Sequence, residues 1–248
     1  MVRIVAIGGG ENGRVGTKYE TKLIDKEIVR LSGKKHPKVL FILPKSPFQE
    51  NYFQQMQKVF RKLGCNISPL YLDNRKSNKR ELECAVLGCD IIYVGGGNTL
   101  KMLKDWRKSG LDKILLKASK KNIILSGLSA GAICWFRYGC SYLQQNTNNK
   151  KCFMRIKGLD LIPALCCPHY DDGTDRKFNL EKMMKRTTEI GLAFDNCSAI
   201  EIIDYKYRII TSNRKANAYR VYWKDGEYHE EIIEKKKNFS PISELLVK

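Results

Sequence analysis

The 248-residue sequence has no apolar run long enough to cross a bilayer. Its purely apolar stretches, such as Val39 to Pro44 and Ala130 to Phe136, end far short of the roughly 20 residues that a transmembrane helix needs. The amino-terminal residues also lack the long apolar region and the small-residue cleavage site of a secretory signal. We therefore expect a cytoplasmic protein without a membrane partner.

The nine cysteines include no Cys-x-x-Cys pair and no ladder of cysteine and histidine. Because an odd number cannot pair completely, reduced and mostly buried thiols are expected. One close set of metal-ligand types exists, formed by Cys166, Cys167 and His169. Neighbouring cysteines in a strand point to opposite faces, so this set does not favour a metal site.

Acidic residues are outnumbered, with 26 Asp and Glu against 45 Lys and Arg, which gives a net charge of +19. The lysines are spread along the chain, and the denser runs, such as Lys117 to Lys121, are short. Dispersed charge of this kind is typical of a solvated surface. No helix-turn-helix signature, aromatic and basic RNP-like segment or zinc motif accompanies it, so nucleic-acid binding is a hypothesis that rests on charge alone.

Apolar, β-branched runs alternate with helical patterns through the first half of the chain, which predicts an α/β fold with a mostly parallel sheet covered by helices on both faces. Pro69 would put the third strand near an edge of the sheet. The predicted strands are Val2 to Ile7, Lys38 to Pro44, Asn66 to Leu72, Asp90 to Val94 and Asn122 to Ser126, and the predicted helices are Phe48 to Leu63, Thr99 to Ser109, Leu111 to Lys120 and Ala130 to Tyr138.

The final third contains short runs separated by turn residues, which predicts an antiparallel extension of the parallel core. A polar surface loop is expected at Gln144 to Lys151. No Pro/Gly/Ser linker and no internal repeat interrupts the chain, so residues 1–248 are interpreted as one α/β domain. The predicted strands of the extension are Ala199 to Asp204, Tyr207 to Ser212, Ala218 to Trp223 and Tyr228 to Glu234.

The residues from Gly127 to Gly131 form a Gly-x-Ser-x-Gly motif after an apolar strand and before a helix of small residues. A serine at such a turn has a strained backbone and an exposed hydroxyl, and the flanking glycines allow the sharp turn. Ser129 is therefore a candidate nucleophile, and the helix that begins at Ala130 would direct its free N–H groups toward an oxyanion. The alternative is an ordinary turn in which Ser129 caps the helix.

A nucleophilic serine needs a base, and the chain has only three histidines. His36 lies in a polar segment and His229 on a charged late strand, so both are expected to face solvent. His169 ends the apolar run Leu161 to Pro168 and opens a polar loop, where the carboxyl end of a strand would deliver its side chain to a cleft. His169 is therefore the candidate base, with a purely structural histidine as the alternative.

A second glycine cluster, Gly95 to Gly97, follows a predicted strand and is followed by Asn98. It lacks both the Lys-Ser/Thr ending of a P-loop and the spacing of a dinucleotide fingerprint. Exposed backbone N–H groups in this loop would complete an oxyanion hole with the amide of Ala130. The amino-terminal cluster Gly8 to Gly10 is interpreted as a plain turn.

These motifs, taken in order with Pro168-His169-Tyr170, resemble the dipeptidase E and cyanophycinase family of serine peptidases, from the first strand to about Ser212. The resemblance implies a three-layer, flavodoxin-like sheet similar to that of class I glutamine amidotransferases, with serine in place of their cysteine. It also implies cleavage of small peptides next to aspartyl residues. Position by position, Ser129 becomes the nucleophile, His169 the general base, and the amides of Gly97 and Ala130 the oxyanion hole.

The third member of the triad is less defined. Relatives have an acid in a Gly-x-x-x-acid turn after the histidine, and the matching stretch here ends at Asp195, which is the first candidate; Glu201 is the second. Asp195 also fits a turn-capping role. For substrate binding we expect Asn98, and Arg176, whose guanidinium would meet a carboxylate bidentately, unless it is only solvated.

The expected reaction is acyl transfer to water through a Ser-His acyl-enzyme, with a short peptide as substrate and no metal or organic cofactor. Many relatives have Ser-Asp-Ser where this chain has Ser141-Tyr142-Leu143, and no acid occurs between Ser129 and Asp160. The alternative is therefore a catalytically weakened member that binds a small acidic ligand or a protein partner. The sequence leaves open whether two chains pair as a homodimer.

Overall fold

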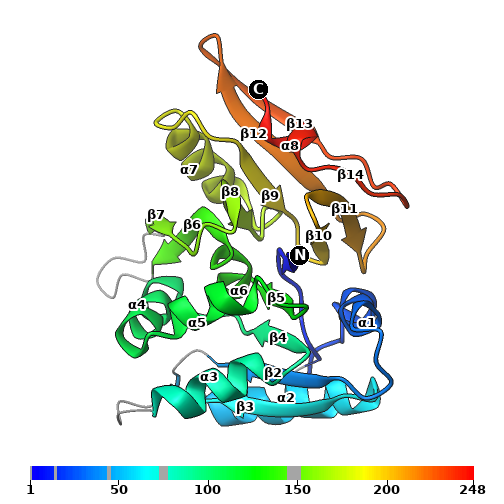
Figure 1. Cartoon of the computed structure of the whole chain (residues 1–248). Helices are drawn as coiled ribbons and strands as arrows, with labels where there is room; N and C mark the ends of the chain where they lie inside the picture. Colours follow the sequence, from blue (N-terminus) through cyan, green and yellow to red (C-terminus); the bar gives the residue numbers. More distant parts are fainter. Residues whose placement is uncertain (1, 14–15, 44–45, 73–77, 144–151) are drawn as a thin grey trace.

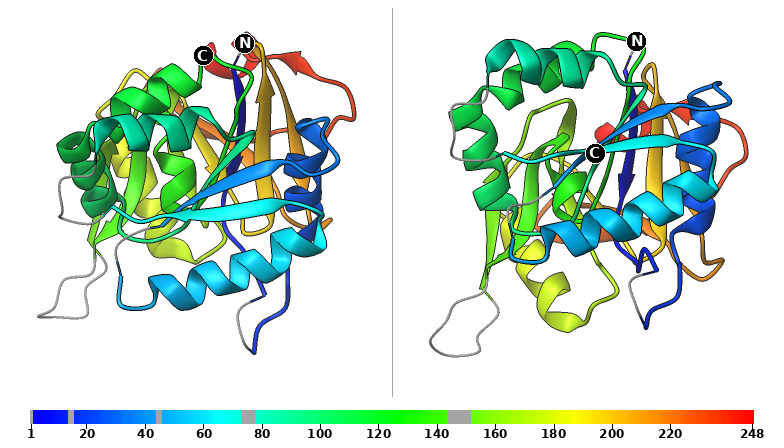
Figure 2. Two further views of the ribbon diagram at one scale, coloured as in Figure 1. Left: turned by 60° about the horizontal axis from the view of Figure 1, so that its bottom comes forward. Right: turned by 90° about the horizontal axis from the view of Figure 1, so that it is seen from below.

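A computed structural model describes the chain except for residues 1, 14–15, 44–45, 73–77 and 144–151 (Figure 1). It is a mixed α/β structure with two sheets, and helices lie against both (Figure 2). The predicted surface loop at Gln144 to Lys151 lies outside the described residues. No helix in the described part of the chain is both long and apolar enough to cross a membrane.

The first sheet has the strand order β14-β11-β10-β1-β5-β4-β2-β3. Its five strands from β1 to β3 in that order run parallel, and β10, β11 and β14 continue it in antiparallel fashion. Pro69 lies in β3 at the edge, as predicted. The strands are β1 (Arg3–Ile7), β2 (Lys38–Ile42), β3 (Asn66–Leu70), β4 (Ile91–Val94), β5 (Ile124–Leu128), β10 (Ser198–Ile203), β11 (Lys206–Thr211) and β14 (Ser240–Pro241).

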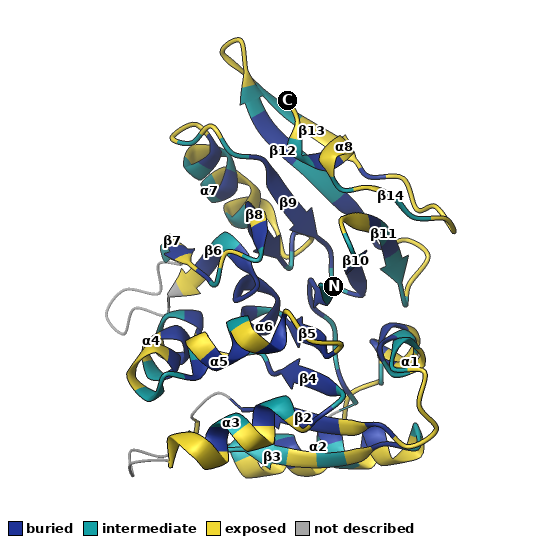
Figure 3. Cartoon of the chain, viewed as in Figure 1, coloured by how far each residue is buried: buried dark blue, intermediate teal, exposed yellow. Residues whose placement is uncertain are grey.

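Alternating side chains of the parallel strands enter two separate apolar clusters, one on each face of this sheet. Ile4 and Ala6 of β1 pack in the cluster that contains α3 to α6, whereas Val5 and Ile7 pack in the one that contains α1 and α2. Strands β1, β2, β4 and β5 are buried along most of their length, whereas the edge strand β3 is partly exposed (Figure 3). The helices are α1 (Lys22–Leu31), α2 (Gln49–Lys62), α3 (Lys79–Leu87), α4 (Thr99–Ser109), α5 (Leu111–Ala118) and α6 (Ala130–Ile133).

The second sheet has the order β13-β12-β9-β8-β6-β7, in which β8 runs parallel to both β6 and β9. Helix α7 packs on it through Leu180 and Met184, and the short helix α8 lies near the carboxyl terminus. The elements are β6 (Phe136–Leu143), β7 (Cys152–Lys157), β8 (Ile162–Pro168), α7 (Thr174–Met184), β9 (Gly191–Phe194), β12 (Ala218–Lys224), β13 (Glu227–Ile232) and α8 (Ser243–Leu246).

Two sequence-based expectations about elements need correction. The helix expected from Ala130 to Tyr138 ends at Ile133, and β6 begins at Phe136, because its aromatic residues favour a strand that pairs with β7 and β8. The carboxyl-terminal strands also do not form one extension. β10 and β11 join the first sheet, while β12 and β13 join the second.

Candidate active site

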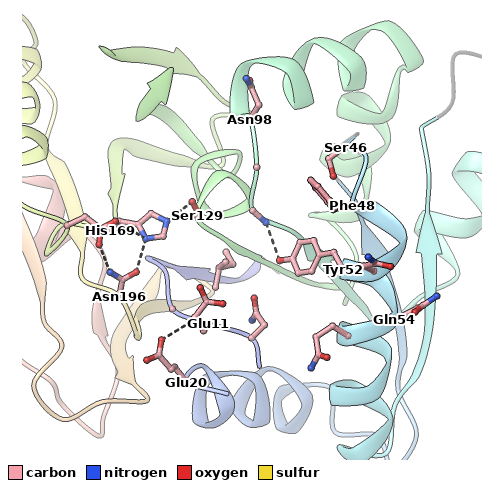
Figure 4. A pocket seen from close by; sticks show the side chains of 18 of the residues that line it. Glu11, Glu20, Ser46, Phe48, Tyr52, Gln54, Asn98, Ser129, His169 and Asn196 are labelled. Carbon is pink, nitrogen blue, oxygen red and sulfur yellow. Dashed lines mark hydrogen bonds and ion pairs between the residues drawn. The ribbon is translucent and has the colours of Figure 1, made fainter. Parts of the chain in front are cut away.

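The candidate site lies where the carboxyl ends of three parallel strands of the first sheet, β1, β4 and β5, come close to those of two parallel strands of the second sheet, β8 and β9. Ser129 follows β5, His169 follows β8 and Asn196 follows β9 by two residues, while the glycine clusters follow β1 and β4. Ligand sites of α/β proteins form at such strand ends, where loops leave the sheet in different directions. Figure 4 shows the side chains of Ser129, His169 and Asn196 in a row at the rim of a pocket.

Ser129 occupies the sharp turn between β5 and α6, with φ 57° and ψ −111°. Such a conformation is strained for a residue with a Cβ atom and persists only where the surroundings enforce it. Here the amide of Ser129 donates to the carbonyl of Ile7 at 2.9 Å. A Cβ atom on Gly127 would lie 2.4 Å from the carbonyl oxygen of Gly131, and one on Gly131 would lie 2.2 Å from that of Val94. Both glycines are therefore required by close backbone packing.

The hydroxyl of Ser129 and the imidazole of His169 are within hydrogen-bond distance, with 2.8 Å between Oγ and Nε2. His169 also has a positive φ, 53°, and its amide donates to the carbonyl of Gly8 at 3.1 Å. Burial lowers the pKa of His169, the hydrogen bond to Oδ1 of Asn196 opposes that shift, and the charge of Arg176 adds to the lowering. The imidazole is thus held in its neutral form, which is able to accept a proton.

Asn196 contacts the other nitrogen of the imidazole, with 2.7 Å between its Oδ1 and Nδ1 of His169. Its Nδ2 donates to Asp171 at 2.9 Å and to Asp172 at 2.8 Å. Gly9 makes room for this arrangement, because a Cβ atom there would lie 2.1 Å from Oδ1 of Asn196 and 2.3 Å from Nδ1 of His169. The first glycine cluster is therefore more than a plain turn.

The two predicted candidates for the third triad position make their contacts elsewhere. The carboxylate of Asp195 accepts from the amide of Asn217 at 2.8 Å and from the hydroxyl of Tyr219 at 3.5 Å, and burial raises its pKa. Glu201 is fully buried on β10 and pairs with Arg208 at 2.8 Å. The structure brings neither carboxylate to His169.

The second glycine cluster lies beside Ser129, as the sequence predicted. Gly97 has φ 155° and lines the same pocket as Ser129, and Ala130 opens α6, where a first-turn amide has no intrahelical acceptor. Asn98 also lines this pocket, but its Oδ1 accepts from the amide of Lys101 at 2.9 Å and so caps α4. Its Nδ2 is the group that remains for a ligand.

The pocket is an open cleft of about 1390 Å³. Its charged lining residues have both signs: Glu11, Glu20 and Asp172 are acidic, and Lys58 and Lys101 are basic. The remaining lining residues are polar, aromatic or small, and they include Asn12, Ser46, Phe48, Asn51, Tyr52, Gln54, Gln55 and Leu128 (Figure 4).

Arg176, the predicted carboxylate-binding residue, does not line this cleft. It lies on α7, with its guanidinium 5.0 Å from the centre of the Phe153 ring. Its charge still lowers the pKa of His169. The described residues place no cation from α7 in the cleft.

The cysteines next to His169 are buried on different sides of β8. Cys166 packs in the large cluster beside β9 and α6, and Cys167 packs in the cluster beneath α7. Within the described ranges, no group of three metal-ligand side chains gathers anywhere. The other histidines lie away from the cleft: Nδ1 of His36 contacts the carbonyl of Gly64 at 3.0 Å, and His229 stacks on Tyr222.

Two residues of this site escaped the sequence analysis, Asn196 and Gly9. Asn196 directly follows Asp195, the predicted acid. Its position was the available signal, because it comes just after β9, the neighbour of the strand β8 that precedes His169. An acid was expected there, so the neighbouring amide was not considered. Gly9 stood out in the sequence only as part of the glycine cluster, because the residues it contacts lie at least 160 positions further along the chain.

The sequence of the chain matches a known protein family. The profile described as Peptidase family S51 matches residues 4–210. Uncharacterized peptidase YgaJ of Bacillus subtilis (strain 168) is 32% identical over 232 residues, which is 93% of this chain and 96% of that protein. Peptidase E of Salmonella heidelberg (strain SL476) is 26% identical over 144 residues, 57% of this chain and 58% of that protein.

The fold also matches a solved structure. The crystal structure of a peptidase from an acI-B1 Actinobacterium superposes with a TM-score of 0.73 at 16% identity, and the match covers 97% of both chains. At this identity the match establishes the shared fold and no more.

Proposed function

The chain belongs to peptidase family S51 and is a serine peptidase, and from that premise we propose that it hydrolyses short peptides through an acyl-enzyme formed on Ser129. The observation that carries this proposal is the contact of 2.8 Å between Oγ of Ser129 and Nε2 of His169 at the wall of an open cleft. Nucleophilic catalysis typically uses a nucleophile within hydrogen-bond distance of a base, and a third group that contacts and orients the base.

In the first half of the reaction, His169 takes the proton of Ser129 while Oγ attacks the peptide carbonyl. His169 then gives this proton to the leaving amine, and the peptide bond breaks with the acyl group on Oγ. In the second half, water loses a proton to His169 and attacks the ester, and Oγ regains its proton as the acid product leaves.

The negative oxygen of the tetrahedral intermediate would be stabilised by the amides of Gly97 and Ala130. Ala130 supplies the free N–H at the start of α6, and Gly97 lies on the loop that lines the same cleft. Preorganised backbone donors of this kind are worth about 10² to 10³ in kcat each.

Short peptides suit the cleft because both of their ends carry charge. Among the residues that the structure describes, Lys58 and Lys101 are the lysines that line the cleft. They would therefore take a peptide carboxylate, including that of an aspartyl side chain, in the role that the sequence had assigned to Arg176. The Nδ2 group of Asn98 would add a hydrogen bond. Aspartyl dipeptides are therefore the first substrates to assay.

The test compares wild type, Ser129→Ala and a control serine variant on a dipeptide library and on a fluorophosphonate probe. Ser109 is the control, because it lies at the end of α4 outside the cleft, where its hydroxyl donates to the carbonyl of Trp106 and accepts from the amide of Leu111. We expect Ser129→Ala to lose both hydrolysis and labelling, with Ser109→Ala unchanged. Equal hydrolysis by wild type and Ser129→Ala would refute the proposal.

One observation favours a second candidate, a weakened hydrolase that binds a small acidic ligand. The group at Nδ1 of His169 is the neutral amide of Asn196, and a neutral partner stabilises an imidazolium less than a carboxylate does. Thermal stabilisation by acidic dipeptides without their turnover would favour this candidate, and turnover at ordinary enzyme rates would exclude it.

A further inference from the structure

The side chain of Asn196 lies between the imidazole of His169 and two carboxylates. Oδ1 faces Nδ1 of His169 at 2.7 Å, and Nδ2 donates to Asp171 and Asp172 at 2.9 and 2.8 Å. The backbone amide of Asn196 also donates to Asp171, at 2.8 Å. The neighbouring groups thus bind the amide side chain from both ends.

Only one orientation of this amide satisfies its neighbours. Ionised carboxylates accept hydrogen bonds and cannot donate them, so the NH₂ group of Asn196 must face Asp171 and Asp172. The flipped orientation would place Oδ1 against two carboxylates and would remove both hydrogen bonds that Nδ2 donates to them. The oxygen of the amide is therefore directed at His169.

This orientation decides which nitrogen of His169 carries the proton. An acceptor at Nδ1 requires Nδ1–H, which leaves the lone pair of Nε2 facing Oγ of Ser129. With the amide reversed, its NH₂ group would donate to Nδ1 and put the proton on Nε2, and that tautomer cannot accept the proton of Ser129. In serine peptidases the wrong tautomer costs about 10⁴ in kcat.

We propose that Asn196 is the third member of the triad in this chain, and that Asp171 and Asp172 are positioning residues that act through it by fixing the orientation of its amide. This proposal rests on the proposed function, because it concerns how the same serine and histidine are prepared for catalysis. In a Ser-His-Asp triad a single carboxylate holds the imidazole in the correct tautomer. Here the amide of Asn196 and the two aspartates would together have that role.

The local backbone is built to hold these groups together. The amide of Asp172 donates to the carbonyl of His169 at 3.1 Å, so residues 169–172 form a tight turn. The amide of Tyr170 donates to the carbonyl of Phe194 at 2.9 Å, which ties this turn to β9 shortly before Asn196. Gly9 packs against both His169 and Asn196 with no room for a side chain.

The aspartates also provide the negative charge that Asn196 lacks. Oδ2 of Asp172 lies 3.7 Å from Nδ1 of His169, and the charges of Asp172 and Asp171 raise the pKa of His169 against burial and Arg176. Glu11 and Glu20, from the loop after β1, also line the cleft (Figure 4). Asp172 is half exposed, so its direct effect on an imidazolium is partly screened by water.

The test separates amide orientation from charge with three variants. A release variant, Asp171→Ala with Asp172→Ala, removes both acceptors. A swap variant, Asp171→Asn with Asp172→Asn and Asn196→Asp, exchanges the donor and acceptor groups, so that two amides donate to one carboxylate at position 196. Asp175→Ala is the matched control, because Asp175 lies on the first turn of α7 just beyond the pair and its side chain is exposed.

Two measurements are made on each variant. The ¹⁵N chemical shifts of the His169 ring report its tautomer, and the pH dependence of fluorophosphonate labelling and of kcat and KM reports its work as a base. In the release variant we expect loss of the Nδ1–H tautomer and a fall in kcat of at least about 10-fold with KM nearly unchanged. The swap variant should recover the tautomer and most of the rate, and Asp175→Ala should match wild type.

A release variant with the wild-type tautomer and rate would overturn the proposal. A folded swap variant as slow as the release variant would also overturn it, because correct orientation would then not restore function. Absence of labelling at Ser129 in wild type would instead refute the proposed function, and the His169 tautomer would still test the role of the aspartates.

Discussion

Gly9→Ala is expected to slow catalysis strongly while the chain stays folded. Gly9 does not have a positive φ, so alanine fits its backbone conformation. The added Cβ atom, however, would lie 2.1 Å from Oδ1 of Asn196 and 2.3 Å from Nδ1 of His169, where ordinary contact begins at 3.4 Å. Both groups must retreat by roughly 1 Å, so the Ser129 to His169 hydrogen bond of 2.8 Å is stretched or misaligned.

A displacement of about 1 Å in an active site costs about 10² in rate, while overpacking of this size costs about 1 to 3 kcal/mol of stability. We therefore expect Gly9→Ala to be folded at 25 °C, with its fluorophosphonate labelling rate reduced about 100-fold. Gly33→Ala is the control, because its φ of 65° strains an alanine by about 1 kcal/mol although nothing lies within 4 Å of the new Cβ. Gly9→Ala with a wild-type labelling rate would refute the packing argument.

Three further predictions concern charge. Burial lowers the pKa of His169 below 6.5. The neutral, competent form of the imidazole therefore persists at pH 6.5, and the labelling rate should fall only at lower pH. A half-maximal labelling rate above pH 7 would contradict this prediction. Burial raises the pKa of Asp25 to about 6, so folding favours its protonated form. The free energy of unfolding should therefore fall by up to about 3 kcal/mol as pH rises from 3.8 to 6. Urea titrations should show this loss in wild type and not in Asp25→Asn. An equal dependence of the unfolding free energy on pH in both proteins would disprove the prediction. Arg176→Ala should leave KM for acidic dipeptides nearly unchanged, because Arg176 packs on Phe153. Lys101→Ala should raise this KM by up to about fivefold, as expected for an exposed ion pair. The reverse ranking in steady-state kinetics would place the carboxylate at α7.

The sequence predicted those parts of the fold that depend on local pattern. The helix Thr99 to Ser109 was predicted with the observed bounds, since an asparagine cap begins it and Gly110, with φ 77°, follows its end. The buried parallel strands β1, β2, β4 and β5 were predicted because burial on both faces produces continuous apolar runs. The positions of Ser129 and His169 at strand ends were predicted because each directly follows an apolar run.

What the sequence could not predict depends on contacts between distant residues. The small residues after Ser129 predicted one long helix, because the pairing of Phe136 with Ile162 depends on a strand that begins 26 residues further along the chain. The resemblance to the family indicated Asp195, the acid of a Gly-x-x-x-acid turn, but the direction of a side chain at a strand end is decided by the neighbouring strands. The amide of Asn217 takes the carboxylate of Asp195, and His169 takes the amide of Asn196.

A covalent intermediate at Ser129 is the central step of the proposed reaction, and trapping that intermediate tests the step directly. An aspartyl dipeptide ester would be mixed with the protein, quenched in acid within milliseconds and analysed by peptide mass spectrometry. We predict one acyl group on the peptide that contains Ser129, none in Ser129→Ala and far less in His169→Ala. Ester hydrolysis at an unchanged rate in Ser129→Ala, or an acyl group on any other residue, would contradict the account.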